Sequence, residues 1–210
     1  MAIIIITALL FLWNLLVIHV ISKWFYTVFL KFENVPAVYV GRKIVHIFGG
    51  GVTSLLIPRF YQGYYWIVTV SAWALAIYVY YRRKRNHLYW FQVHDNAYEV
   101  HFSLAYGAIL LAGLLVGDIW VGLIPTLFMS FGDSATGLVR AFTQQKQVKS
   151  WDGTLAMIAV CSCIGYWKLG WYGLFVGVVV SLVEKIPNID DNLTVPALSA
   201  ALVWLGNHLF

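Results

Sequence analysis

The chain has 210 residues, of which 61% are hydrophobic and only 11% carry a formal charge. Soluble domains have roughly 25% charged residues, so this chain has too few of them to cover a water-facing surface. The composition, with 17% aromatic residues and ten Trp, also excludes a disordered chain, a collagen-like chain and a nucleic-acid-binding tail. It leaves an integral membrane protein that has almost no room for a soluble domain.

Apolar runs predict an all-helical, polytopic membrane protein with about seven or eight transmembrane helices, some of them short or broken. The candidate spans are residues 3–21, 44–57, 64–81, 101–117, 119–131, 154–169, 171–183 and 193–210. Two of these runs are only 13 residues long, so we expect them to continue into polar turns or to line a cavity. The chain is predicted to be one membrane-embedded domain, with a first span and loop at 1–40, a catalytic core at 41–196 and the rest of the last span at 197–210.

Charged residues are distributed unequally between the two sides that eight spans would define. The odd-numbered loops hold 12 of the 14 Lys and Arg residues, and the even-numbered loops hold only Arg59 and Lys168. Basic loops stay in the cytoplasm, which predicts an outside N-terminus. Eight of the nine acidic residues lie on the same side as the basic ones, with Asp118 as the exception. The positive-inside rule does not require this, so we expect a polar site at the cytoplasmic boundary.

The first polar cluster contains Arg42, Lys43 and His46 and runs into three glycines. Read as a helix, one face carries Arg42, His46, Gly49, Gly50 and Thr53. Two cations beside a His suit an anion such as phosphate. Basic residues that flank a span can also act only as topology anchors. An ionisable group that faces the interior of a membrane protein is usually functional, which makes His46 the stronger signal.

Two further clusters place single charges at the ends of apolar spans. Asp133, Thr136, Gly137 and Arg140 fall on one helical stripe. Asp133 either pairs with Arg140 or holds Mg²⁺ together with phosphate oxygens. Lys149 and Asp152 lie three residues apart, where Lys can bind phosphate and Asp can simply cap the helix.

Acidic residues gather near the end of the chain, where Glu184, Asp190 and Asp191 lie within eight residues. Adjacent carboxylates repel unless something positive lies between them, so a divalent ion is one explanation and a solvated acidic loop is the other. Glu99 and His101 open the fourth span and are either site groups or part of a wet loop.

Four motifs in this order resemble the polyprenol kinase family, which includes dolichol kinase, phytol kinase and the CTP-dependent diacylglycerol kinase, and which is distantly similar to the phosphatidate cytidylyltransferases. The motifs are Arg42-Lys43-x-x-His46, Gly132-Asp133-Ser134-Ala135-x-Gly137, Lys149-Ser150-x-Asp152-Gly153-Thr154 and Glu184 followed by Asp190-Asp191-Asn192-Leu193-Thr194-x-Pro196. The resemblance covers residues 41–196. Asp152 stands where the family pattern has Glu.

The resemblance implies transfer of the CTP γ-phosphate, with Mg²⁺, to a membrane lipid alcohol of the polyprenol, dolichol or phytol type. The expected metal ligands are Asp133, Glu184, Asp190 and Asp191. The expected nucleotide-binding residues are Arg42, Lys43, Arg140, Lys149, Gly153, Asn192 and Thr194. The expected catalytic residues are Asp133, His46, Lys149 and Asp152, with His46 and Asp133 both candidates for the general base.

Three other functions fit the same pattern. A diacylglycerol kinase differs only in the acceptor, and a cytidylyltransferase transfers CMP and releases pyrophosphate. A small-solute transporter explains the short spans as broken helices. The expected partners are CTP, a lipid alcohol and membrane lipid, without nucleic acid, and assembly into a homo-oligomer is left open. The expected location is the cell membrane of a prokaryote or the endoplasmic reticulum of a eukaryote, with the site facing the cytoplasm.

Overall fold

The computed structural model describes residues 1–93, 96–144, 149–187 and 190–209, and every regular element in these ranges is helical. The elements are α1 (Ala2–Leu16), η1 (Val17–Ile21), α2 (Ser22–Phe29), α3 (Ala37–Ile44), η2 (Val45–Gly51), α4 (Val52–Phe60), α5 (Tyr65–Arg85), α6 (Tyr98–Leu115), α7 (Trp120–Leu127), η3 (Phe128–Gly132), α8 (Asp133–Thr143), α9 (Trp151–Glu184) and α10 (Asp191–Leu209). Asp95 and Lys146, which the charge pattern assigns to the cytoplasmic side, lie outside the described residues, as does Phe210 in the last predicted span.

Several consecutive elements join into longer rods, because the residues between them keep helical backbone angles. The π-helical stretches η1, η2 and η3 each lie inside such a rod. The resulting rods are α1–η1–α2, α3–η2–α4, α5, α6, α7–η3–α8, the two arms of α9, and α10. The prediction of an all-helical protein is therefore confirmed.

Helix α9 is folded back on itself at Gly170. This residue has φ 59° and ψ −142°, a combination that residues with a Cβ rarely adopt. The two arms then pack through small residues, with Gly165 against Gly173 and Gly177 against Cys161. The predicted short span at 171–183 is thus the second arm of a helical hairpin.

In the part of the chain that the structure describes, four helical segments are long and apolar enough to cross a membrane: Ala2–Phe29, Ala37–Phe60, Tyr98–Leu115 and Trp151–Glu184. The first of them has the most lipid-like surface. No residue of α1 is buried, and its large side chains, such as Ile4, Leu9 and Leu12, are exposed. Exposed apolar side chains of this density fit a bilayer rather than water.

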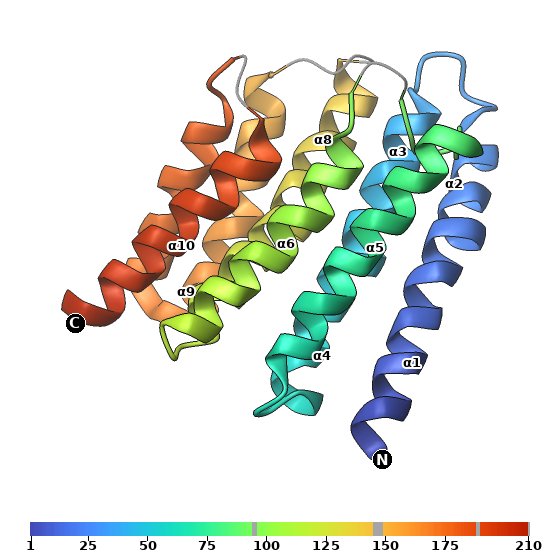
Figure 1. Ribbon diagram of the computed structural model, residues 1–210. Helices are drawn as coiled ribbons and strands as arrows, with labels where there is room; N and C mark the ends of the chain where they lie inside the picture. Colours follow the sequence, from blue (N-terminus) through green and yellow to red (C-terminus); the bar gives the residue numbers. More distant parts are fainter. Residues whose placement is uncertain (94–95, 145–148, 188–189, 210) are drawn as a thin grey trace.

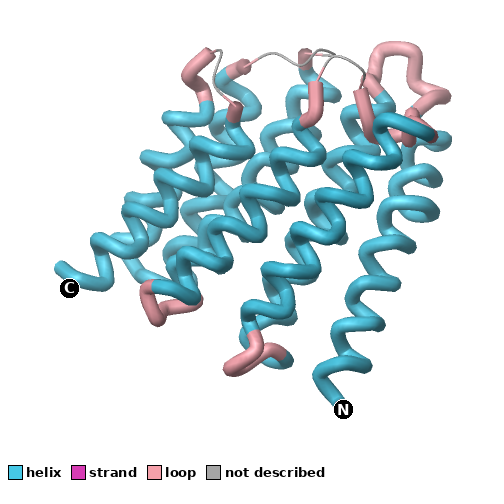
Figure 2. Tube along the Cα trace, in the orientation of Figure 1, coloured by secondary structure: helices cyan, strands magenta, loops and turns pink. Residues whose placement is uncertain are grey.

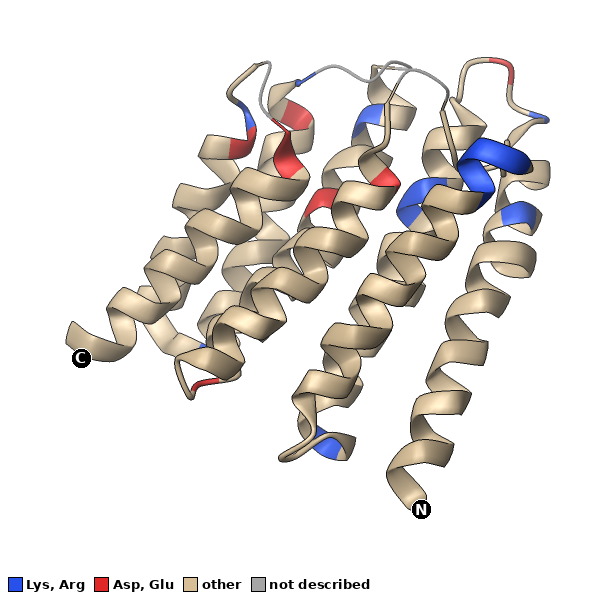
Figure 3. Ribbon diagram, viewed as in Figure 1, with Lys and Arg blue, Asp and Glu red and all other residues tan. Residues whose placement is uncertain are grey.

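The rods run up and down side by side, and the two termini lie at the same end of the bundle (Figures 1 and 2). Charged residues gather at the opposite end (Figure 3). This charged end receives the last turns of α5 and α8 and the first turns of α6, α9 and α10. The structure therefore brings together the charges that the loop pattern assigns to one side.

The three π-helical stretches concentrate near the charged half, where η2 contacts both η1 and η3. A π-helical turn is wider than an α-helical turn, and such turns occur frequently at functional sites. His46 lies inside η2, and Asp133 directly follows η3.

Two predicted span boundaries are wrong, because the helices continue through charged residues that were expected to end them. The second span was expected to begin at Ile44, but its helix begins at Ala37 and includes Arg42 and Lys43, both 4% exposed. The span at 119–131 likewise continues to Thr143 and includes the buried Arg140. These helices continue through charged residues because the buried cations have carboxylate acceptors on other helices. Lys43 donates to Asp133 on α8, and Arg140 donates to Glu184 on α9.

Candidate active site

The centre of the site is the carboxylate of Asp133, in the first turn of α8. Its Oδ1 accepts a hydrogen bond from Lys43 Nζ at 2.7 Å, and its Oδ2 lies 3.1 Å from His46 Nδ1. All three residues are less than a tenth exposed. A buried charge of this kind is tolerated when it is paired and hydrogen-bonded. The sequence alternative in which Asp133 pairs with Arg140 is therefore wrong.

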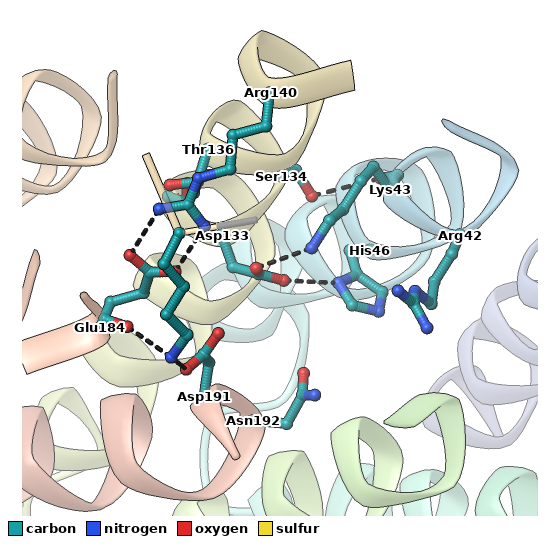
Figure 4. A network of polar contacts seen from close by, with 12 residues as sticks. Arg42, Lys43, His46, Asp133, Ser134, Thr136, Arg140, Glu184, Asp191 and Asn192 are labelled. Atoms are coloured by element: carbon teal, nitrogen blue, oxygen red, sulfur yellow. Dashed lines mark hydrogen bonds and ion pairs between the residues drawn. The ribbon is translucent and has the colours of Figure 1, made fainter. Parts of the chain in front are cut away.

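Lys43 reaches Asp133 because α8 has a glycine at the crossing point. A Cβ on Gly137 would overlap the Cε atom of Lys43. The crossing is fixed from the other side as well, since Ser134 Oγ donates to the backbone carbonyl of Lys43 at 3.2 Å. Figure 4 shows these side chains pointing toward one another between α3 and α8. The Gly132–Gly137 motif thus supplies the carboxylate, a hydroxyl and the space for the lysine.

A second buried ion pair joins α8 to the end of α9. Arg140 donates two parallel hydrogen bonds to Glu184, from Nη1 to Oε1 at 2.8 Å and from Nη2 to Oε2 at 3.1 Å. Gly153, predicted to bind nucleotide, makes room for this arginine, because a Cβ there would overlap Arg140 Nε. Arg140 and Glu184 are 4% and 1% exposed. This pair therefore ties the helices together and is screened from water.

Lys149 is the cation of the network that is most accessible from water. Its Nζ donates to Asp191 Oδ1 at 2.5 Å and to the backbone carbonyls of Glu184 and Ile186 at 2.6 and 2.7 Å. The side chains of Lys149 and Asp191 are each 24% exposed, whereas that of Lys43 is 5% exposed. An anion arriving from the charged end thus meets Lys149 before it meets Lys43.

The remaining residues of the acidic segment are held by local contacts and by α6. Asp190 Oδ2 lies 2.6 Å from His101 Nδ1, and its Oδ1 accepts hydrogen bonds from the backbone and side-chain nitrogens of Asn192. Thr194 donates to the backbone carbonyl of Asp190 at 3.1 Å. Asp190 thus caps α10, and the two adjacent aspartates have separate partners, His101 for Asp190 and Lys149 for Asp191.

Two predicted site residues lie toward the edges of this network. Asp152 is exposed and accepts a hydrogen bond from Gln144 at 2.8 Å. Arg42 lies on the other side of His46, where its guanidinium stacks over the rings of Tyr39 and Tyr98 at 5.1 and 5.6 Å. The structure does not bring Asp152 together with Asp133, and it leaves Arg42 facing a cavity.

Among the described residues, no group of three or more His, Cys, Asp or Glu side chains is arranged to hold a metal ion. Each of the four predicted ligands is paired with a basic group instead: Asp133 with Lys43, Glu184 with Arg140, Asp190 with His101 and Asp191 with Lys149. The donor set therefore does not fit a resident metal held by protein alone. It fits a metal that arrives with phosphate oxygens and needs only one or two carboxylates.

An elongated cavity begins beside His46 and extends away from the charged end. It contains about 810 Å³ of empty space, part of it open to the surroundings, and four rods line it. The face predicted from sequence is confirmed, since Arg42, His46, Gly49, Gly50 and Thr53 all line it. Most of the other lining residues are apolar, among them Leu10, Ile18, Val68, Leu75 and Phe91. The cavity is therefore lined mainly by apolar side chains, with polar groups of Arg42 and His46 at one end.

His46 lines the polar end of this cavity, and contacts on two sides hold its ring. A carboxylate only accepts hydrogen bonds, so contact with Asp133 places the ring proton on Nδ1. The Nε2 atom is buried and has no hydrogen-bond partner among the described residues. Phe102 stacks on the imidazole with ring centroids 3.8 Å apart and planes 15° apart, which fixes the ring orientation. Buried polar groups normally have a partner, so Nε2 is an acceptor that a group entering the cavity can use.

Sequence reasoning missed Phe102 and gave little weight to Glu99. Both line the cavity together with Tyr106, and these residues recur at helical spacing on one face of α6. Glu99 is 5% exposed and accepts hydrogen bonds from Arg83 and Gln92. The signal in the sequence was the helical spacing of Glu99, Phe102 and Tyr106, which places one acidic and two aromatic side chains on the same face.

The site thus combines a carboxylate–imidazole pair, the three buried cations Arg42, Lys43 and Arg140, the more accessible cation Lys149 and an apolar cavity. Comparison of the chain with known protein families, with curated proteins and with solved structures found no match.

Proposed function

We propose that the protein is a CTP-dependent kinase that phosphorylates a membrane lipid alcohol at the charged end of the bundle. The observation that carries this proposal is the position of His46, which is held by Asp133 on one side and presents an unpartnered Nε2 atom at the polar end of an apolar cavity. A hydroxyl at the end of a hydrocarbon chain is the substrate group that suits both features.

The proposed chemistry assigns the general-base role to His46. Its Nε2 accepts the hydroxyl proton while the lipid oxygen forms a bond to the γ-phosphorus and the bond from that phosphorus to the β–γ bridging oxygen breaks, which releases CDP. Asp133 holds the imidazole in the required tautomer and stabilises the imidazolium that forms. Asp133 is a weaker candidate for the base, because both its oxygens are occupied by Lys43 and His46.

The phosphate chain of the nucleotide would bind on the accessible side of the network. Lys149 would meet it first, and Lys43 and Arg42 would lie nearest the transferred group. Cations positioned in a dry site stabilise the charge of a phosphoryl-transfer transition state. We expect Mg²⁺ to enter as part of the Mg·CTP substrate. Of the four predicted ligands, Asp190 and Asp191 are the more accessible, because Arg140 holds both oxygens of Glu184, and Lys43 and His46 hold those of Asp133. The choice of CTP rests on the family resemblance.

Membrane location has a chemical reason in this proposal. A long prenol stays in the bilayer and CTP stays in water, so the catalyst must place a charged pocket at the boundary between them. We propose that all eight rods cross the membrane, with the charged end in the cytoplasm as the positive-inside rule indicates.

The experiment is incubation of the purified protein with CTP, ATP or GTP and a panel of prenols and diacylglycerol, followed by mass spectrometry of the lipids. A prenyl monophosphate formed with CTP supports the proposal. Phosphatidate as the main product would support the diacylglycerol kinase alternative, and unmodified lipid with every nucleotide would overturn the proposal.

Gly137→Ala provides a test of how Lys43 is positioned. The added Cβ displaces Lys43 Cε and therefore separates the ammonium from Asp133. Misplacement of a catalytic group by about 1 Å costs about 100-fold in rate, so we expect a loss of that order in kcat with the protein still folded. The matched control is Val139→Ala on the same helix, which should keep wild-type kcat. Equal kcat values for both variants would show that Lys43 does not act in turnover.

A further inference from the structure

The cavity beside His46 reaches α1 and the end of α4. Tyr61 Oη donates to Thr7 Oγ1 at 3.1 Å, which joins the end of α4 to α1, and both residues line the cavity. Along α3–η2–α4 the lining runs from Arg42 to Tyr61, a length of about 28 Å at ~1.5 Å per helical residue. This is close to the ~30 Å hydrocarbon thickness of a bilayer. An extended chain of ten isoprene units is longer than this, so the cavity cannot enclose it to its end.

A second hollow lies on the outer side of the same region, between α1 and α5. It is lined by Ile4, Thr7, Ala8, Phe11, Leu12 and Ile67, and it shares Thr7 and Phe11 with the cavity. We call it the α1–α5 slot. Its lining is apolar apart from one threonine, and the neighbouring side chains of α1 are exposed. The slot therefore faces the surroundings in which α1 lies, and it suits hydrocarbon rather than water.

We propose that the hydrocarbon chain of the acceptor alcohol enters and leaves the cavity sideways through the α1–α5 slot. This inference rests on the proposed function and names how its substrate is bound. The hydroxyl lies at His46, the first part of the chain fills the cavity, and the remainder passes Phe11 into the bilayer. An alcohol of any greater length is then accepted, whereas a fully closed cavity would set an upper limit on chain length.

A bulky side chain in the α1–α5 slot should lower kcat/KM for long alcohols and leave kcat/KM for short alcohols unchanged. Ala8 lines the slot and is exposed, so Ala8→Trp narrows the slot without disturbing a packed core. We expect this variant to lower kcat/KM for decaprenol about tenfold or more, equivalent to about 1.4 kcal/mol, and to leave kcat/KM for geraniol unchanged, because geraniol is short enough to lie within the cavity. Ala74→Trp is the matched control, since Ala74 is exposed on α5 and lines neither space. Equal effects of Ala8→Trp on both alcohols, or an effect on neither, would overturn the inference.

A binding measurement separates this inference from the proposed function. A decaprenol that carries a photoreactive diazirine part-way along the chain, where the chain would pass Phe11, is irradiated with the purified protein without nucleotide, and the labelled peptides are sequenced. We expect labelling of Phe11 and Ile67 that excess unlabelled decaprenol removes. Labelling that is not competed, or that is confined to the Tyr61 end of the cavity, would contradict lateral passage. Competed labelling at the slot by a protein that phosphorylates no lipid would instead contradict the proposed function alone.

Discussion

Replacement of His46 by Gln is expected to lower kcat about 100-fold to 10,000-fold, the usual contribution of general acid–base catalysis. Gln keeps a polar group near Asp133 but has no nitrogen that can accept the hydroxyl proton. Because the substitution leaves the apolar lining and the cations in place, the dissociation constants for decaprenol and CTP should change little. Single-turnover rates and equilibrium binding of both substrates measure the two quantities separately.

His19→Gln is the matched control for this result. His19 lies in η1, contacts Tyr78 at 2.7 Å and does not line the cavity. It should retain wild-type kcat. A His46→Gln variant with kcat within a few-fold of the His19→Gln control would exclude His46 as the base and would leave Asp133 as the remaining candidate.

The second large effect concerns stability. Arg140→Met leaves the carboxylate of Glu184 buried without its cation, and breaking a buried pair in this way costs about 3–5 kcal/mol. We expect the free energy of unfolding, measured by denaturant titration in mixed micelles, to fall by that amount. The double variant Arg140→Met, Glu184→Leu should recover most of the loss, since replacing both members of a buried pair by apolar groups is often neutral.

Arg85→Met serves as the control for this series, because Arg85 is exposed at the end of α5 and contacts only the ring of Tyr81 among the interactions described. Its free energy of unfolding should stay within about 0.5 kcal/mol of the wild-type value. A double variant as unstable as Arg140→Met would mean that the pair is not what stabilises this end of the bundle.

Much of the architecture followed from the sequence, because membrane proteins segregate apolar and charged residues strongly. The apolar runs predict the helical class. The charged end follows because the loops between these runs lie alternately on the two sides of the membrane, and the charged residues fall in the loops of one side. The cavity face was predictable from helical spacing alone, since Arg42, His46 and Thr53 recur with the period of a helix and all line the cavity. Local geometry of this kind depends only on neighbours along the chain.

The pairing of charges was not predictable, because partners come from segments far apart. One of the two interpretations of Asp133 paired it with Arg140 in its own helix, but its partner Lys43 is 90 residues away. Lys149 lies three residues from Asp152 and yet donates to Asp191, 42 residues away. The packing of the helices decides which of these charged side chains lie close enough to pair. The role of Gly153 as space for Arg140 was hidden for the same reason.

The central claim is that the γ-phosphoryl group passes from the nucleotide to a lipid hydroxyl at His46. The most direct measurement uses two parallel reactions of the purified protein in decaprenol-containing vesicles, one with CTP labelled at the γ-phosphate and the other with CTP labelled at the α-phosphate. The account predicts labelled lipid monophosphate from the γ-labelled nucleotide and unlabelled lipid from the α-labelled one. Lipid labelled from the α-phosphate would show nucleotidyl transfer instead, and lipid labelled from neither would contradict the account.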